Sequence, residues 1–261
     1  MKALSRDQWL TILVSILALA ILYFGFDIKP KSQKQLEKTR AFNIEATSIE
    51  NLIREAKMSL GSRYGLIESI YMELSDEKND SLKVEKLKQL SGKWYEMGFP
   101  AISGYYAEEI AKNVDGGESW AMAGTTYLLS VQQAQEEKVK IWSFNRAVKA
   151  FEAAISLEPH NLSHRINLAL VYVELPPSDQ PMKGILMLRS LEEEFPDNVQ
   201  ILTQLGRLSI RTNQLENALK RLKQAEEIDP KNKNVICLLA IVYEKLSDQT
   251  NAEKYSNQCV Q

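Results

Sequence analysis

The feature that most constrains the fold is a set of small residues and prolines that recurs with a period of 34 residues. In a frame that starts at residue 199, glycine or alanine occupies positions 8, 20 and 27, and proline occupies position 32. Small side chains at these spacings let two helices cross closely, and proline ends the second helix. The residues at the repeat positions are Trp120, Gly124, Tyr127, Ala147, Pro159, Gly206, Ala218, Ala225, Pro230, Ala240 and Ala252. The period predicts stacked helix pairs that bury a shared core.

The period extends over five consecutive frames, about 84–116, 117–160, 161–198, 199–232 and 233–261. The second frame carries an insertion of 11 residues, and the third carries one of four residues in a proline-rich turn. The third frame also departs from the pattern, because Leu168 fills position 8 and Gly184 fills position 20. We interpret this as an exchange of side-chain size: the large side chain lies on the first helix and the small one on the second.

The pattern resembles the tetratricopeptide repeat (TPR) family, whose signature W-x2-L-G-x2-Y, then A, F, A and P, is clearest in 120–159 and 202–230. The resemblance covers about two-thirds of the chain. Together with the N-terminal segment, it implies an all-α fold: a transmembrane helix followed by a right-handed TPR-type α-solenoid of about five helical hairpins. The chain looks like membrane-anchored bacterial TPR proteins that assist translocation or assembly.

The N-terminal segment 9–26, WLTILVSILALAILYFGF, carries no charge. At about 1.5 Å per residue its 18 residues would cover about 27 Å, close to the roughly 30 Å hydrocarbon core of a bilayer. A cleavable signal peptide is the alternative, but bulky aromatics and then Asp27-Ile28-Lys29-Pro30 stand where a cleavage site would lie. We predict a tail over 1–8 and a single membrane-spanning helix over 9–27 in the inner or plasma membrane.

The charged residues on either side of the predicted span do not decide on which side of the membrane the solenoid lies. More Lys and Arg residues follow the span than precede it, which leans toward a cytoplasmic solenoid. A periplasmic solenoid is the alternative, because a single anchor preceded by basic residues often runs the other way.

Cys237 and Cys259 flank the turn near Asp248 and could face each other. We expect small core residues there, and a disulfide only in an oxidising compartment.

Residues 28–82 are predicted to be a helical linker or hairpin. One helix runs from Ser32 to Leu60, and a second runs from Tyr64 to about Asp76. The first helix carries an apolar stripe that could form a short dimerising coiled coil, or could pack on the next helix of the same chain. We favour the second. The stripe consists of Phe42, Ala46, Ile49, Ile53, Ala56 and Leu60.

The last frame stops at position 29, so its outer face is either apolar and open to a partner or covered by polar residues. We expect Lys254, Asn257 and Gln258 to cover it, because a solenoid end needs a polar surface.

In TPR solenoids the concave wall is formed by the first helix of each pair, and the resemblance carries this wall over to the chain. The wall is apolar in its middle and basic toward its C-terminal half, which suits an extended or helical peptide with an acidic feature. A solvated basic face is the alternative. The partner-binding residues implied by the resemblance are Met122, Leu129, Arg165, Tyr172, Arg207, Arg211 and Lys245.

No catalytic pattern is present in the sequence, and we predict neither an enzyme nor a metal or other cofactor. His160 and His164 lack metal-ligand spacing, and His164 occupies a packing position, so we expect a satisfied core histidine. The net charge of −2 argues against nucleic acid. Two hypotheses follow: an adaptor that holds a protein partner at the membrane for complex assembly, secretion or quality control, or a homo-oligomeric membrane scaffold built on the juxtamembrane helix.

Overall fold

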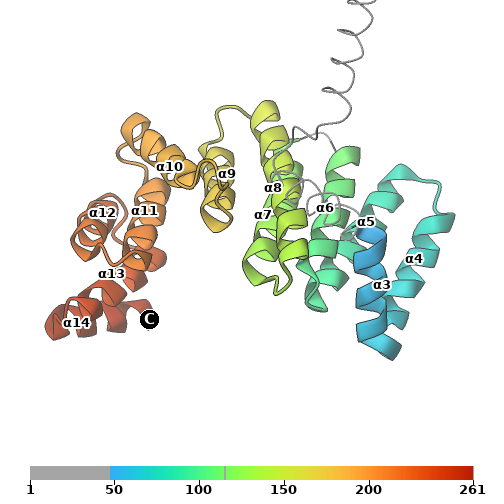
Figure 1. Ribbon diagram of the computed structural model, residues 1–261, viewed down its shortest axis with the longest axis horizontal. Coiled ribbons are helices and arrows are strands. Elements are labelled where there is room, and N and C mark those ends of the chain that lie inside the picture. The colour runs from blue at the N-terminus through green and yellow to red at the C-terminus, as the bar shows by residue number, and fades with distance from the viewer. Residues whose placement is uncertain (1–47, 115, 261) are drawn as a thin grey trace, which may run out of the picture. The chain divides into compact units, whose positions relative to one another are not determined.

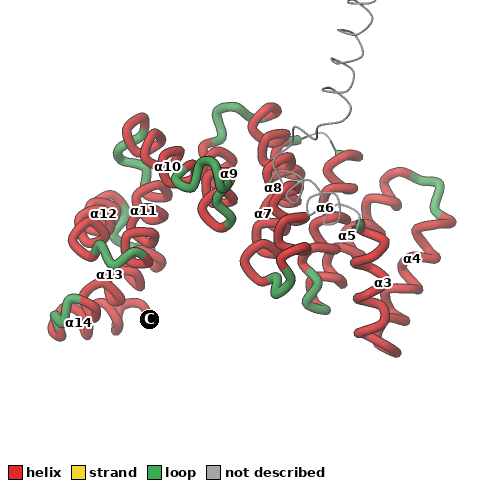
Figure 2. Tube along the Cα trace, in the orientation of Figure 1, coloured by secondary structure: helices red, strands yellow, loops and turns green. Residues whose placement is uncertain are grey.

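The computed structural model describes residues 48–114 and 116–260, which apart from Ser48 belong to one compact unit. Every regular element in these two ranges is a helix, as Figures 1 and 2 show. The all-α prediction is therefore confirmed for this part of the chain. The elements are α3 (Ile49–Leu60), the 3-10 helix η1 (Gly61–Tyr64), α4 (Gly65–Asp76), α5 (Asp80–Glu96), α6 (Pro100–Asn113), α7 (Gly117–Gln133), α8 (Glu137–Leu157), α9 (Leu162–Glu174), α10 (Lys183–Glu194), α11 (Val199–Arg211), α12 (Leu215–Ile228), α13 (Lys233–Lys245) and α14 (Gln249–Val260).

From α5 onward, consecutive helices form a stack of five hairpins (Figure 1). The two helices of each hairpin contact each other, and the second helix of each hairpin contacts the first helix of the next. Every hairpin from α7 onward lies inside its predicted frame, whereas α5 begins ahead of its frame at Asp80. This is a TPR-like solenoid, in which each pair completes the core of its neighbours. The right-handed sense of the stack stays a prediction.

Gly124 and Gly206 show why position 8 is small. A β-carbon on Gly124 would lie 2.9 Å from ring atoms of Phe151, and one on Gly206 would lie 2.8 Å from Cγ of Leu222. Phe151 and Leu222 stand at position 24 of the same frames and are fully buried. A β-carbon at these positions would therefore require the side chain at position 24 to shift, and a residue larger than alanine would push apart two helices that share a close-packed core.

Serines replace the small residues in the α5–α6 hairpin. The Ser91 hydroxyl donates to the Ser103 carbonyl at 3.0 Å, and the Ser103 hydroxyl donates to the Ser91 carbonyl at 2.8 Å. These residues occupy positions 8 and 20 of the first frame, where the helices cross. The reciprocal bonds satisfy both hydroxyls, so the crossing tolerates polar side chains.

The turns between the two helices of a hairpin follow one rule in three frames. Gly98, Asn213 and Ser247 all stand at position 15 and all have a positive φ, of 85°, 57° and 62°. A left-handed residue ends the first helix and reverses the chain in a short turn. The other two frames carry their insertions in this region instead. In the second frame the insertion coincides with the two long helices α7 and α8, of 17 and 21 residues.

The described part of the apolar stripe packs within the chain itself, with Ala56 and Leu60 buried and Ile49 and Ile53 partly buried. Leu52, Ala56 and Leu60 of α3 join the core built by η1 and α4 to α6. α3 contacts α6, and Glu55 forms an ion pair with Lys138 on the first turn of the long helix α8, at 3.1 Å. The expected packing within the chain is thus observed, although α6 and α8 take part as well as the following helix. Phe42 and Ala46, and with them the first part of the predicted long helix, lie outside the described residues.

The predicted membrane span, residues 9–26, also lies outside the described residues. Within 48–114 and 116–260, no helix has the length and apolar character needed to cross a bilayer.

Candidate partner-binding surface

We call the surface formed by α7, α9, α11 and α13 the A-helix face. α7 contacts α9, and α11 contacts α13. Polar side chains join neighbouring helices along this face: Ser163 Oγ donates to Gln200 Oε1 at 3.1 Å, and Arg207 Nη2 donates to Asn234 Oδ1 at 2.9 Å. The face is therefore a continuous surface with a fixed register between its helices.

This register corrects the third frame by one residue. Ser163 pairs with Gln200, and Glu174 pairs with Arg211, each 37 residues further along the chain. Frames that start at 161 and 199 would give a spacing of 38. With a start at 162 and an insertion of three residues instead of four, both pairs join equal positions of the two frames, 2 with 2 and 13 with 13.

Packing at the helix crossing gives the same answer. A β-carbon on Gly184 would lie 2.5 Å from the Ala169 carbonyl oxygen, and Ala169 is fully buried. Ala169, and not Leu168, therefore fills position 8, so this frame keeps the small residue that it was predicted to lack. The sequence contained the signal: Leu168-Ala169-Leu170-Val171-Tyr172 matches L-A-x2-Y.

Tyr172 and Arg165 move off the A-helix face with this correction. Tyr172 is buried, with its ring centroid 5.7 Å from that of Phe144 on α8 and the Lys183 ammonium of α10 3.7 Å over its face. Arg165 makes two hydrogen bonds to Glu194 of α10, at 2.8 and 3.3 Å. Both side chains thus contact the second helices of hairpins, which corrects their predicted place on the wall.

Three of the predicted cations do lie on the A-helix face, and they differ in how they are paired. Arg207 is exposed and bonds to the neutral amide of Asn234. Arg211 forms an ion pair with Glu174 at 3.2 Å. Lys245 is exposed and makes no hydrogen bond or ion pair within the described residues. Two positive charges, on Arg207 and Lys245, are therefore not neutralised by the described part of the chain.

The apolar part of the predicted wall lies on α7. Met122 is 63% exposed and Leu129 is half-buried. In the corrected frame, α9 contributes Asn167 and Leu170 at positions 6 and 9, two half-buried residues that the sequence analysis missed because of the register error. The binding role of all these residues stays a prediction.

Residues 199–232 match the protein family described as tetratricopeptide repeat. The matched range coincides with the fourth frame, which contains Gly206, Arg207 and Arg211. A comparison with curated proteins gives no match.

Among solved structures, TTC0263, a thermophilic TPR protein of Thermus thermophilus, is 16% identical to this chain. Its TM-score is 0.48, and the match covers 82% of this chain and 100% of that one. MamA from residue 41 onward, from Desulfovibrio magneticus, is 16% identical with a TM-score of 0.41 over 68% and 93% of the two chains. YrrB, described as a TPR protein with an unusual peptide-binding site, is 15% identical with a TM-score of 0.38 over 74% and 92%.

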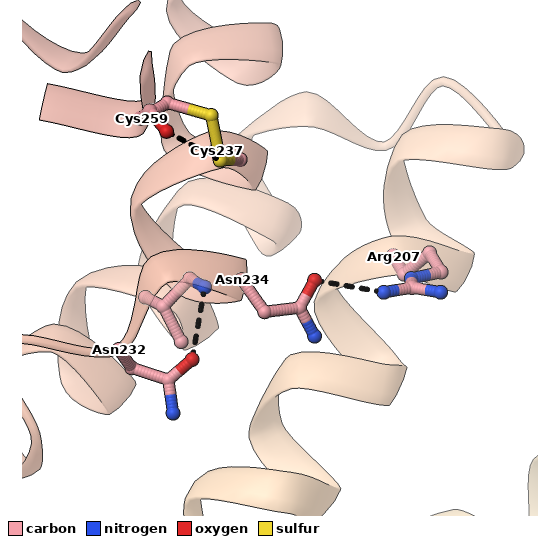
Figure 3. Close-up of a disulfide and its surroundings, with 6 residues drawn as sticks. Arg207, Asn232, Asn234, Cys237 and Cys259 are labelled. Carbon is pink, nitrogen blue, oxygen red and sulfur yellow. Dashed lines mark hydrogen bonds between the residues drawn. A yellow bond between two sulfur atoms is a disulfide. The ribbon is translucent and has the colours of Figure 1, made fainter. Parts of the chain in front are cut away.

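The last hairpin differs from the α11–α12 hairpin before it by a covalent link. Cys237 of α13 and Cys259 of α14 form a disulfide, with their Cα atoms 5.0 Å apart (Figure 3). The expectation of two unlinked core cysteines is therefore wrong. Cys259 stands at position 27, where Ala154 and Ala225 are fully buried in earlier hairpins. The outer residues Lys254, Asn257 and Gln258 are exposed, as expected.

His164 is buried and serves the structure. Its Nε2 lies 3.0 Å from Glu158 Oε2, while its Nδ1 is buried without a hydrogen-bond partner in the described part of the chain. The histidine is thus only half satisfied, which differs from the expectation. Hydrogen bonds from His164 and Asn161 and from the Glu118 backbone lower the pKa of the Glu158 carboxyl. In residues 48–114 and 116–260, no three His, Cys, Asp or Glu side chains lie close enough together to hold a metal ion.

Proposed function

We propose that this chain is a membrane-anchored TPR adaptor that binds a protein or peptide partner on its A-helix face, in complex assembly, secretion or quality control. The observation that carries the proposal is the exposed guanidinium of Arg207, whose hydrogen-bond partner Asn234 is neutral. A guanidinium that lacks a carboxylate can bind one from a partner through two parallel hydrogen bonds.

The expected partner carries an acidic feature next to apolar residues. Arg207 and Lys245 supply positive charge on α11 and α13, while Met122 and Leu129 supply apolar surface on α7. A peptide that combines both chemistries would gain hydrophobic contact from one end and charge-assisted hydrogen bonds from the other.

The alternative, a homo-oligomeric scaffold built on the juxtamembrane helix, is less well supported. A coiled coil needs its apolar seam exposed to a partner helix. Ala56 and Leu60 of that seam are instead buried in the core that α3 shares with α4 to α6.

We propose further that the solenoid lies on the oxidising side of the membrane. The support is the Cys237–Cys259 disulfide, since disulfides persist in oxidising compartments and are rare in reducing ones. The number of Lys and Arg residues near the predicted span favoured the cytoplasmic side, with the periplasmic side as the alternative. The disulfide is independent of that charge count and supports the alternative.

Labelling of thiols in intact cells with a membrane-impermeant maleimide, with and without a reductant, tests the placement. Labelling that requires prior treatment with a membrane-impermeant reductant supports it, and labelling that appears only after the membrane is permeabilised overturns it.

The binding surface is tested by crosslinking in native membranes followed by mass-spectrometric identification of partners. We expect the double variant Arg207→Glu/Arg211→Glu to lose a partner that the wild-type chain captures. Arg189→Glu is the matched control, because Arg189 is an exposed arginine on α10, away from the A-helix face. Equal capture by the double variant and the control would refute the proposed surface.

A further inference from the structure

A polar pocket lies away from the A-helix face, between α6, the first turn of α7, and α8. Its volume is about 440 Å³. Three of its lining side chains are cations and two are indoles, together with one amide and one carboxylate. The side chains used below are Lys112, Trp120, Trp142, Asn145, Arg146 and Lys149.

The carboxylate among the lining residues, Glu108, is already used within the fold. Its Oε2 accepts hydrogen bonds from Tyr127 at 2.8 Å and from Arg146 at 2.7 Å, and its Oε1 lies 3.0 Å from the Lys112 ammonium. Burial by itself raises the pKa of Glu108, but these hydrogen bonds from Lys112, Tyr127 and Arg146 lower it overall. Glu108 is therefore ionised at neutral pH and offers little to a ligand.

Arg146 is held in place before any ligand arrives. Its guanidinium carbon lies 4.5 Å from the Trp142 ring centroid and 5.9 Å from that of Tyr105, and one of its nitrogens is fixed by Glu108. Arginine has five N–H donors, so most of them stay available. A guanidinium held in this way loses little conformational entropy when it binds an anion.

Asn145 and Lys149 lie on the same helix as Arg146, and both are exposed. Neither makes a hydrogen bond or ion pair within the part of the chain that the structure describes. Lys112 also forms an ion pair with Glu109, outside the lining, at 2.7 Å. The excess of positive charge beside the two tryptophan side chains therefore comes from Arg146 and Lys149.

We infer that this pocket binds the carboxylate of an acidic segment of a protein partner, with Arg146 and Lys149 as the binding cations and Trp120 and Trp142 as the apolar wall. The identity of the ligand as a protein segment rests on the proposed adaptor function. The site is separate from Arg207 and Lys245, so the two can fail independently.

The test uses the full chain in detergent, labelled with 5-fluorotryptophan and titrated with an acetylated hexaglutamate peptide. The chain has four tryptophans, so the ¹⁹F spectrum can be assigned with single Trp→Phe variants. We expect saturable shifts of the Trp120 and Trp142 signals and none of Trp94, which is fully buried and does not line the pocket.

The decisive variants are Lys149→Glu and its matched control Lys140→Glu, which changes the same charge on the same helix outside the pocket lining. We expect Lys149→Glu to weaken binding at least about tenfold and Lys140→Glu to leave it unchanged, because like charge at a contact opposes binding strongly. An equal loss in both variants, or no saturable shift in the wild-type chain, would overturn the site. Inorganic phosphate that gives the same shifts at a lower concentration than the peptide would overturn the peptide as occupant. Arg207→Glu should not alter these shifts, which separates this outcome from a failure of the A-helix face.

Discussion

The α7–α8 hairpin and the α13–α14 hairpin have the same helix order but are held in place by different means. α7 and α8 contact α6 on one side and α9 on the other, and they bury Tyr127 and Phe151 completely. α14 packs on α13 and reaches α12 through Tyr255, and its last turn is joined to α13 by the disulfide. An interior hairpin is stabilised by its neighbours on both sides, whereas in the described part of the chain α13–α14 packs on α11 and α12 and gains from a covalent link.

The largest expected effect comes from breaking the link. Cys237→Ser/Cys259→Ser reopens a loop with a sequence separation of 22, for which chain entropy predicts a loss of about 3 kcal/mol. We expect this loss of stability to appear as faster amide hydrogen exchange in α14, because this hairpin can open locally. Amides of α7 and α8 serve as the internal control. Unchanged exchange in α14 would mean that its contacts with α12 and α13 suffice.

A smaller effect is expected from overpacking an interior crossing. In Gly184→Ala, the new β-carbon would lie 2.5 Å from a backbone oxygen and 2.6 Å from the Val173 backbone nitrogen, neither of which can rotate away. We expect a loss of about 2 kcal/mol in the free energy of unfolding, measured by urea denaturation.

Gly206→Ala is the matched control for this variant. Its β-carbon would meet the Leu222 side chain, which can adjust, and alanine favours the helix by up to about 1 kcal/mol. We expect a loss of less than about 1 kcal/mol. Equal losses in the two variants would contradict the distinction between backbone and side-chain contact.

The smallest expected effect concerns the start of α7, where Glu158 accepts a hydrogen bond from the Glu118 amide at 3.2 Å. The pKa of Glu158 is below its ordinary value in the folded chain. Its contribution to stability is therefore present above the ordinary pKa of about 4.5 and is lost as the pH falls through the lower folded value. We expect Glu158→Gln to be less stable than the wild-type chain at about pH 6 and to approach it near about pH 3.

Gly117→Ala gives a second way to break the same contact, because its β-carbon would lie 2.6 Å from the Glu158 carboxyl carbon and displace it. This variant should share the reduced pH dependence of Glu158→Gln in denaturation measured across the same pH range. Full pH dependence in both variants would show that Glu158 does not stabilise this helix start.

The helical hairpins could be predicted from the sequence because each depends on residues close together in one frame. Gly206 and Leu222 are 16 positions apart, and their contact follows from the spacing alone. The error in the third frame arose where an insertion removed that spacing: a shift of one residue turned Tyr172 from a buried core side chain into an expected wall residue. A rotation of about 100° per helical residue makes a surface prediction far more sensitive to register than a fold prediction.

The candidate surfaces were less predictable for the same reason. The charges of Arg165, Arg207 and Arg211 are visible in the sequence, but their state depends on side chains 27 to 37 residues away. The pocket around Arg146 is lined by side chains from α6, α7 and α8, and no local sequence pattern predicts it.

The sequence by itself determined the repeat period, the small residues at each crossing and the all-helical stack, because these features follow from local spacing and close packing. Only the tertiary structure decided that α3 packs against α6, that Cys237 meets Cys259, and which arginines retain an unneutralised charge. Those outcomes depend on distances between segments far apart in the chain, and a linear pattern does not contain those distances.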